Sequence, residues 1–126
     1  MRIARPTDKL QEIERFYCMG IGLQKLGSFE DHDGYNGLML GLPNYAYHLE
    51  FTQHRDGSPC PAPSKDNLLV LYIPHQSSIE SIANRLQSMG YREVEPENPY
   101  WETKKAITVE DPDGWRVVLM PTAGIN

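Results

Sequence analysis

Residues 47–52, Tyr-His-Leu-Glu-Phe-Thr, have a degenerate counterpart at residues 115–120, Trp-Arg-Val-Val-Leu-Met. Each stretch opens on an aromatic residue and continues as an apolar strand. Gly22 and Gly90 are separated by the same number of residues as the two stretches, and each follows a segment with helical spacing. Two anchors with one spacing indicate that the chain contains two copies of one structural unit. The two stretches are predicted to be the last strand of each copy.

The two copies differ in charge at the fourth position of these stretches. The first has Glu50 where the second has Val118. A carboxylate inside a strand is rare and needs a partner when it is buried. Glu50 is therefore the main functional candidate, and two readings of it stay open. It is either a structural acid paired with Arg2 or Arg116, or a carboxylate that acts on a ligand.

Length and composition indicate a small intracellular domain. The chain has 126 residues, which fits one domain. The longest apolar run, residues 68–73, is too short to cross a bilayer, and the first residues lack the apolar segment of a secretion signal. Cys18 falls in a predicted helix and Cys60 in a Pro-rich loop, so both are expected to be thiols. We expect a cytoplasmic protein without a membrane partner.

The charge of the chain argues against nucleic-acid binding. There are 12 Lys and Arg residues against 17 Asp and Glu residues, which gives a formal net charge of −5. A general nucleic-acid binder needs a basic face. The balance favours a cationic or neutral small molecule instead.

The first half of the chain has the pattern of one β-α-β-β-β unit. Residues 2–6 are predicted to form a strand, and Asp8 with Gln11 a capping box that opens a helix. Gly20 and Gly22 are predicted to end this helix. Strands are expected over residues 23–30, 35–42 and 45–53, with an Asp-Gly hairpin turn at residues 31–34 between the first two.

The second half repeats this order after a polar, Pro-rich linker. A strand over residues 68–73 precedes a helix opened by a Ser77-x-x-Glu80 capping box and closed by Gly90. Strands are expected over residues 91–94, 105–110 and 115–120. The predicted fold class is α+β with eight strands and two helices. The first module covers residues 1–53, the linker residues 54–66 and the second module residues 67–126.

Two motifs extend this pattern to a known superfamily. Phe16-Tyr17 stands near the end of the first helix, and Asp111-Pro112-Asp113-Gly114-Trp115 precedes the last strand. With the paired modules, these resemble the vicinal oxygen chelate superfamily, which includes glyoxalase I, extradiol dioxygenases, fosfomycin-resistance enzymes and bleomycin-resistance proteins. Within it, the chain looks closest to small uncharacterised bacterial members. The resemblance implies mixed sheets cupped around a ligand cavity. In the superfamily the two modules either pair within one chain or are exchanged across a dimer, and both stay open here. We expect a homodimer.

The resemblance also implies positions for metal ligands, on the first and last strands of each module. Glu50 matches the acid expected on the last strand of the first module. The other three positions fall on Arg2, Leu68 and Val118, and none of these side chains binds a divalent cation. Metal sites in proteins need roughly three or more protein ligands. We therefore expect no metal at the usual site of the superfamily.

An alternative metal site remains open on the same strand. Side chains alternate along a strand, so His48 and Glu50 share a face with Thr52 and His54. A His48-x-Glu50 pair could hold a divalent transition metal if a third ligand, such as His32 or His75, came from a loop.

Three further residues complete the predicted ligand-binding set. Arg116 has the parity of Val118, and is expected either to bind an anionic group or to extend into solvent. Tyr72 has the parity of Leu68 and would line the cavity, while Trp101, beside Tyr100 in a Pro-flanked loop, would cover its mouth. Simple packing explains these aromatic residues equally well. The predicted set is Arg2, His48, Glu50, Tyr72, Trp101 and Arg116.

Two functions of different class follow. The first is a metal-independent small-molecule binding protein that resembles the bleomycin-resistance proteins and sequesters its ligand in the cavity. The second is an enzyme, a lyase or isomerase of the glyoxalase type or a resistance transferase, that uses Glu50 as its general base.

Overall fold

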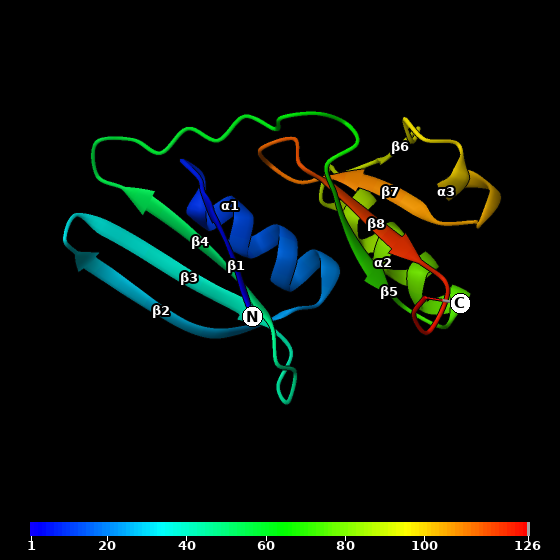
Figure 1. The fold of residues 1–126 in the computed structure, drawn as a ribbon, viewed down its shortest axis with the longest axis horizontal. Coiled ribbons are helices and arrows are strands. Elements are labelled where there is room, and N and C mark those ends of the chain that lie inside the picture. Colours follow the sequence, from blue (N-terminus) through cyan, green and yellow to red (C-terminus); the bar gives the residue numbers. More distant parts are fainter. Residues whose placement is uncertain (126) are drawn as a thin grey trace. The chain divides into compact units, whose positions relative to one another are not determined.

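A computed structural model describes residues 1–125 (Figure 1). The chain divides into two compact units, Met1–Cys60 and a second that begins at Pro61. In chain order the first contains β1 (Arg2–Pro6), α1 (Leu10–Glu14), the π-helix η1 (Arg15–Ile21), β2 (Gln24–His32), β3 (Tyr35–Gly41) and β4 (His48–His54). The second contains β5 (Leu68–Tyr72), α2 (Gln76–Ser88), β6 (Glu93–Val94), α3 (Tyr100–Thr103), β7 (Ile107–Glu110) and β8 (Arg116–Met120).

Each unit is built on one four-stranded mixed sheet, which confirms the predicted α+β class. The strand orders are β1-β4-β3-β2 and β5-β8-β7-β6. In each sheet the first strand of the module pairs in parallel with the last, and the other pairs are antiparallel. No helix within residues 1–125 is long and apolar enough to cross a membrane.

The strand register is the same in both modules. Arg2 lies opposite His48 at the start of β4, and Leu68 lies opposite Arg116 at the start of β8. Glu50 and Val118 therefore occupy equivalent positions, two residues further along. The internal repeat that the sequence predicts is present in the hydrogen-bonded ladder itself.

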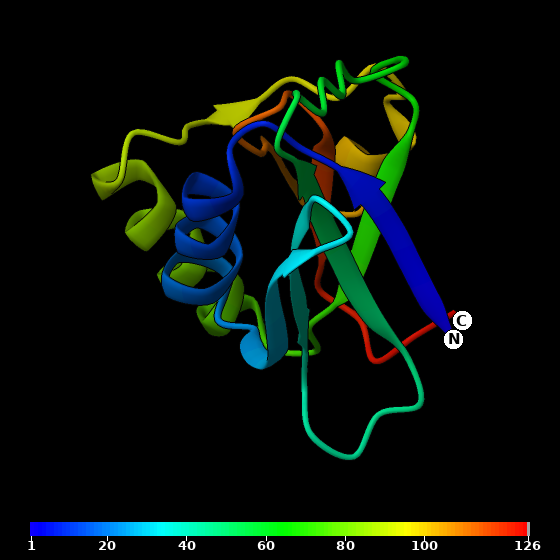
Figure 2. The ribbon, with the colours of Figure 1, turned by 90° about the vertical axis from the view of Figure 1, so that its left-hand side faces the viewer.

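The core of the first module fixes which way the side chains of β4 point. The aromatic ring of Tyr17, on η1, is fully buried and lies 5.2 Å from the ring of Phe51. Figure 2 shows the first helix beside one face of the sheet of β1 to β4. Leu38 is opposite Phe51 on β3 and is buried with it. Phe51 therefore faces the helices. Because successive side chains alternate, Glu50 and His48 point to the other side of the sheet.

The second module has a separate apolar core. Ile79, Ile82 and Leu86 are buried on α2, at the helical spacing that the sequence predicts. Buried residues of the sheet complete this core: Val109, Val117 and Leu119. Gly90 has a φ of 98°, in the left-handed region that glycine adopts at a helix end.

Both predicted capping boxes are wrong. Neither helix has a side-chain cap, and their N-cap residues are Lys9 and His75. The Asp8 carboxylate accepts a hydrogen bond from the Ser58 backbone N–H instead. The hydroxyl of the buried Thr7 accepts a hydrogen bond from the backbone N–H of Lys9, at 3.0 Å. The local pattern assigned the Asp8 side chain to the helix cap, but in the fold it bonds to Ser58, which is distant in sequence.

The first helix also changes type, which the sequence pattern does not reveal. After Glu14 it continues as the π-helix η1, and the backbone N–H groups of Gly22 and Leu23 both donate to the carbonyl of Tyr17. Gly22 has a φ of 103°, so the predicted glycine end is confirmed.

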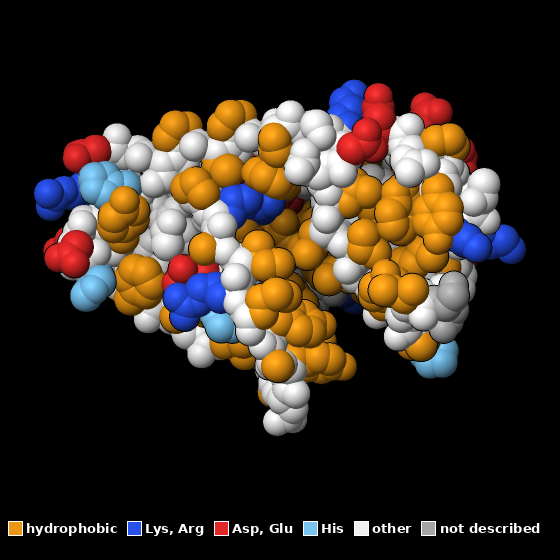
Figure 3. Space-filling view, viewed as in Figure 1, with side chains coloured by type: hydrophobic (Ala, Val, Ile, Leu, Met, Phe, Trp, Pro, Cys, Tyr) orange, Lys and Arg blue, Asp and Glu red, His pale blue; other side chains and the backbone are white. Residues whose placement is uncertain are grey.

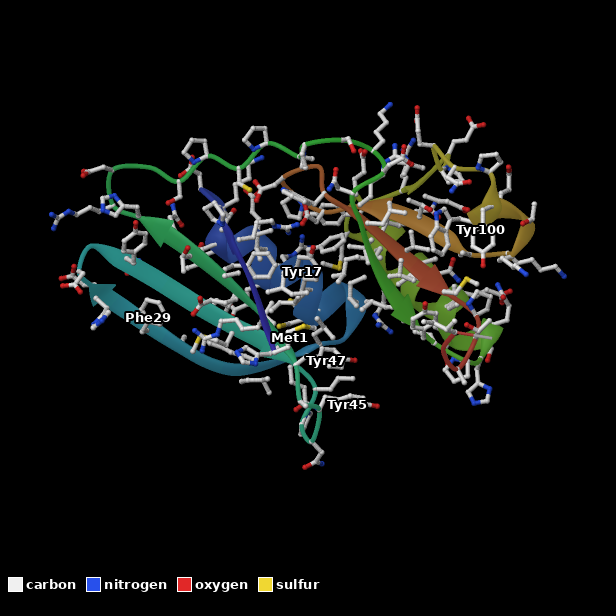
Figure 4. The ribbon with its side chains drawn as sticks, in the orientation of Figure 1. Met1, Tyr17, Phe29, Tyr45, Tyr47 and Tyr100 are labelled. Carbon is white, nitrogen blue, oxygen red and sulfur yellow. The ribbon has the colours of Figure 1, made fainter. Side chains whose placement is uncertain are left out.

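Several elements differ from the predictions. Residues 45–47 form a loop with Tyr45 and Tyr47 exposed (Figure 4), because β1 offers a parallel partner only from His48 onward. Lys105 has a φ of 59°, which is incompatible with a strand, so β7 starts at Ile107. The expected loop around Tyr100 and Trp101 is the short helix α3, one helix more than predicted.

The predicted Asp-Gly turn is confirmed. His32 pairs with Tyr35, which leaves Asp33 and Gly34 as a two-residue loop with φ values of 52° and 87°. Positive φ at both central residues is the signature of a type I′ hairpin turn.

Burial predicts how strongly the core resists truncation. Replacing the fully buried Leu86 with alanine is expected to lower the free energy of unfolding by about 2–5 kcal/mol, because it leaves a cavity in the second module. The matched change Leu42→Ala, at a side chain that is 38% exposed, is expected to cost less than about 1 kcal/mol. Urea unfolding of both variants measures the difference. Equal losses would contradict this assignment of the core.

Candidate functional site

Three of the predicted ligand-binding residues form one cluster on the face of the first sheet that points away from the helices. The parallel register of β1 and β4 places Arg2 directly opposite His48. Glu50 is two residues further along β4 and therefore points to the same side. Figure 3 shows basic, acidic and histidine side chains together on this face of the molecule. The structure thus brings together Arg2, His48 and Glu50, which the sequence separates by nearly half the chain.

The Arg2 guanidinium holds this cluster together. Its Nε donates a hydrogen bond to Nε2 of His48 at 3.1 Å, and its Nη1 donates to Oε2 of Glu50 at 3.3 Å. In this hydrogen bond the lone pair of Nε2 of His48 is the acceptor. Glu50 forms an ion pair with Arg2, one of the two partners that the sequence left open.

The same contacts leave hydrogen-bonding atoms of Arg2 and Glu50 available to a ligand. Within residues 1–125, neither Nη2 of Arg2 nor Oε1 of Glu50 makes a hydrogen bond. The side chain of Arg2 is 52% exposed and that of Glu50 13% exposed, so the donor reaches solvent above a more sheltered carboxylate. The cluster can therefore donate to and accept from the same ligand.

Small and apolar neighbours surround the cluster. Ala4 and Met39 lie opposite Glu50 on the two adjacent strands. A Cβ atom added to Gly41 would meet Cδ1 of Leu26 at 3.0 Å and the Cβ of His48 at 3.3 Å, so the missing side chain lets Leu26 pack beside His48. Sequence reasoning missed Met39 and Gly41. The register of the β3–β4 pair is the signal that would have found them.

The guanidinium of Arg116 serves the second module internally. Arg116 is only 5% exposed, its Nε donates to Oε2 of Glu110 at 3.2 Å, and its Nη1 donates to the carbonyl oxygen of Glu95 at 2.8 Å. Glu110 is its cross-strand neighbour on β7. The expectation that Arg116 extends into solvent is therefore wrong. The buried guanidinium thus connects β8 to β7 and to Glu95, the residue after β6.

The other two predicted residues, Tyr72 and Trp101, also belong to the second module. Tyr72 is at the far end of β5, opposite Met120, whereas Arg116 is opposite Leu68. Four residues along a strand correspond to about 13 Å. Trp101 lies on α3 with its ring 5.0 Å from that of Tyr100, and its indole Nε1 is buried without a hydrogen-bond partner among the described residues. Tyr72 and Arg116 thus do not form one site.

The residues of the cluster do not fit a metal ion. Nε2 of His48 and Oε2 of Glu50 both accept hydrogen bonds from the Arg2 guanidinium, so neither atom is available to a metal ion. A cation there would face the positive charge of Arg2. His32 lies at the exposed hairpin turn, 3.8 Å from Asp33. In residues 1–125 there is no group of three His, Cys, Asp or Glu side chains placed to hold a metal.

A second recess in the first module lies on the opposite face of the sheet. Its volume is about 560 Å³, and it runs between α1 and the strands β2, β3 and β4. Leu38 and Gln53 line it, and both have the parity of Phe51 rather than that of Glu50. It is therefore not part of the Arg2–His48–Glu50 cluster.

Cys18 has the environment of a packed thiol. Burial raises its pKa above the ordinary value, the nearby charge of Glu14 adds to the rise, and Lys25 opposes it. A raised pKa keeps the thiol protonated at neutral pH, and the protonated form is a poor nucleophile.

The contrast between the two arginines gives a test. Arg116→Gln is expected to lower the free energy of unfolding by about 1–3 kcal/mol, because it removes a buried guanidinium and the hydrogen bonds that it donates to Glu110 and to the carbonyl of Glu95. The matched change Arg2→Gln is expected to cost less than about 1 kcal/mol, because its ion pair is half exposed. Urea unfolding compares the two. A larger loss for Arg2→Gln would show that the cluster is a structural element rather than a ligand site.

Comparison with known proteins places the chain in a family. The YycE-like N-terminal domain matches residues 1–52, and the YycE-like C-terminal domain matches residues 66–121. The uncharacterised protein YycE of Bacillus subtilis (strain 168) is 52% identical over 126 residues, which is 100% of this chain and 90% of that protein. A crystal structure of a YycE protein of unknown function from Bacillus subtilis, a suggested glyoxalase/fosfomycin resistance protein, matches with a TM-score of 0.93 at 52% identity. It covers 100% of this chain and 91% of that chain.

More distant structures share the fold. The fosfomycin resistance protein FosX from Mesorhizobium loti matches with a TM-score of 0.74 at 13% identity, over 96% of this chain and 89% of that chain. TnmS3, an antibiotic binding protein from Streptomyces sp. CB03234, matches with a TM-score of 0.66 at 19% identity, over 94% and 91% of the two chains. The protein therefore belongs to the YycE-like family, and its fold is that of the glyoxalase/bleomycin-resistance proteins of the vicinal oxygen chelate superfamily.

Proposed function

We propose that the protein binds a small molecule without a metal ion, through the cluster of Arg2, His48 and Glu50. The observation that carries this proposal is the Arg2 guanidinium, which donates to both side chains that a metal would need. In an ordinary metal site of this fold the carboxylate faces a cation. Here the fixed positive charge of an arginine stands in its place.

The free atoms of the cluster define the chemistry of the ligand. Nη2 of Arg2 donates and Oε1 of Glu50 accepts, so a group with an acceptor beside a donor satisfies both. Primary amides and ureas have this arrangement. The charges of Arg2 and Glu50 offset each other in their ion pair, so the local site favours a hydrogen-bonding ligand over a strongly cationic one. The net charge of −5 attracts cations only weakly and at longer range.

Relatives of the same fold support a binding role. TnmS3 is an antibiotic binding protein, and the Bacillus subtilis YycE protein is a suggested glyoxalase/fosfomycin resistance protein. Sequestration needs a shaped polar site and no reactive group, which agrees with the contacts of the cluster. A cytoplasmic location, as expected from the sequence, is part of this proposal.

The second candidate is an enzyme in which Glu50 acts as general base. It is favoured by the sheltered carboxylate, whose Oε1 makes no hydrogen bond within residues 1–125, next to the His48 imidazole. Glyoxalase I of Leishmania major and FosX share the fold, so a lyase, an isomerase or a resistance transferase is the natural reaction class. The Arg2 ion pair would then position the base rather than bind a metal.

One experiment separates the two candidates. The protein is incubated with an extract of small molecules, and the mixture is followed over time by mass spectrometry, with Glu50→Gln as the matched control. A compound that is retained unchanged by the protein and less well by the variant supports the binder. A compound that disappears as a new one forms, only with the unaltered protein, supports the enzyme. If the unaltered protein neither retains nor converts any compound, the proposed site is wrong.

Metal independence is a separate prediction. Protein purified without a metal-chelating tag is expected to contain well under one equivalent of zinc, iron, nickel or manganese, and chelators are expected to leave its Tm unchanged. The reason is the guanidinium beside Glu50, which repels a cation. Elemental analysis that finds about one equivalent of a transition metal, lost on changing His48 or Glu50, would overturn the prediction and favour the enzyme.

The expected homodimer completes the proposal. Pairing of two copies is common in small soluble proteins and would explain the exposed apolar side chains of Tyr45 and Tyr47. Light scattering at micromolar concentration is expected to give twice the chain mass of 14.4 kDa. A monomer mass would remove the dimer from the proposal.

A further inference from the structure

The ring of Phe29 lies over a glycine on the same face as the cluster. Phe29, on β2, is opposite Gly37 on β3. A Cβ atom added to Gly37 would lie only 2.1 Å from Cε1 and 2.1 Å from Cζ of the ring. The ring therefore occupies the space that a side chain at position 37 would fill. It leans across the sheet from β2 toward β4.

The strand register places this ring near Glu50. Gly37 is opposite Thr52, and Met39 is opposite Glu50, so all of these positions share one face of the sheet. Gly37 and Glu50 are diagonal neighbours, and such pairs are about 7–8 Å apart. Figure 4 shows Phe29 across β2 and β3, and Figure 3 shows apolar side chains beside the charged group in the same view.

A second glycine on this face, Gly27, also lies under an apolar side chain. A Cβ atom added to Gly27 would meet Cε of Met39 at 3.0 Å, so Met39 extends toward β2 and away from Glu50. Phe29, Met39 and Leu26 are apolar side chains of β2 and β3 that each lie over a glycine on this face. The sheet thus carries an apolar surface beside a polar donor and acceptor.

We propose that Phe29 determines ligand specificity, as a platform on which a planar group of the ligand stacks while a hydrogen-bonding group reaches Arg2 and Glu50. The inference rests on the proposed function and narrows its ligand to aromatic or conjugated amides and their analogues. The spacing of about 7–8 Å suits a single ring with one polar substituent. Stacking on an aromatic ring favours a flat partner over an aliphatic one of equal size.

A purely structural role for Phe29 has a different consequence. An aromatic ring over a strand glycine also stabilises a sheet by itself. In that case, removing the ring lowers the Tm but leaves the relative affinity for flat and aliphatic ligands unchanged. The ratio of two affinities, rather than stability, is therefore the decisive measurement.

The probes are benzamide and cyclohexanecarboxamide, which carry the same amide on a flat and on a puckered ring. Ligand-observed NMR titration gives both Kd values. The unaltered protein is expected to bind benzamide about threefold to tenfold more tightly than cyclohexanecarboxamide. Phe29→Leu keeps an apolar side chain but removes the flat face, and Gly37→Ala displaces the ring. Both are expected to reduce the ratio to about one.

Gly27→Ala is the matched control, because it adds the same methyl group to the same hairpin without touching Phe29. The φ angles of Gly27 and Gly37 are outside the left-handed region, so alanine fits the backbone at both positions. The control is expected to retain the preference for benzamide.

Fluorine labelling of phenylalanine reports the contact directly. The chain has only 3 phenylalanines, and Phe16 and Phe51 are 0% and 2% exposed, so they serve as internal controls. Benzamide is expected to shift the Phe29 signal alone. An unchanged affinity ratio in Phe29→Leu, a Phe29 signal that does not move while benzamide binds, or no benzamide binding at millimolar concentration overturns the inference.

Glu50→Gln separates the inference from the proposed function. If this variant loses affinity for both amides while Phe29→Leu keeps the ratio of the unaltered protein, the polar site stands and the platform is wrong. If Phe29→Leu removes the preference while Glu50→Gln changes neither affinity, the platform stands and the polar role of the cluster is wrong.

Discussion

Parallel pairing of the first strand of each module with its last strand is the constraint on which the rest of the structure depends. Two parallel strands cannot be joined by a tight turn, so a helix and a hairpin must be placed between them in the chain. The pairing also sets which residues meet. Because Arg2 starts β1 and His48 starts β4, the two side chains stand opposite each other, and Glu50 follows on the same face. One residue of slippage would turn Glu50 into the core.

The same backbone arrangement carries different chemistry in the two modules. In the first, Arg2 is half exposed and connects two side chains at the open face of the sheet. In the second, the position equivalent to His48 is Arg116, which is buried and bonded to Glu110 and to the carbonyl of Glu95. The first arginine leaves hydrogen-bonding atoms available to a ligand. The second strengthens its own sheet.

Glycine positions decide how much of the open face a ligand could reach. Gly37 leaves the space that the Phe29 ring fills, and Gly41 leaves the space that a methyl group of Leu26 fills beside His48. With alanine at position 37, the ring would have to stand away from the sheet. The polar cluster and its apolar border are thus separate consequences of one hairpin register, which is why variants can test them separately.

The repeat, the α+β class, the hairpin turn at Asp33-Gly34 and the grouping of His48 with Glu50 on one face follow from the sequence, because each is a local pattern of period, turn chemistry or alternation. Tertiary contacts decided the rest. Asp8 accepts from Ser58 instead of capping its helix, and Lys105 ends a predicted strand through its positive φ. The sequence left the partner of Glu50 open between Arg2 and Arg116. Only the strand register resolved it, since residues distant in the chain become neighbours through pairing that no local pattern encodes.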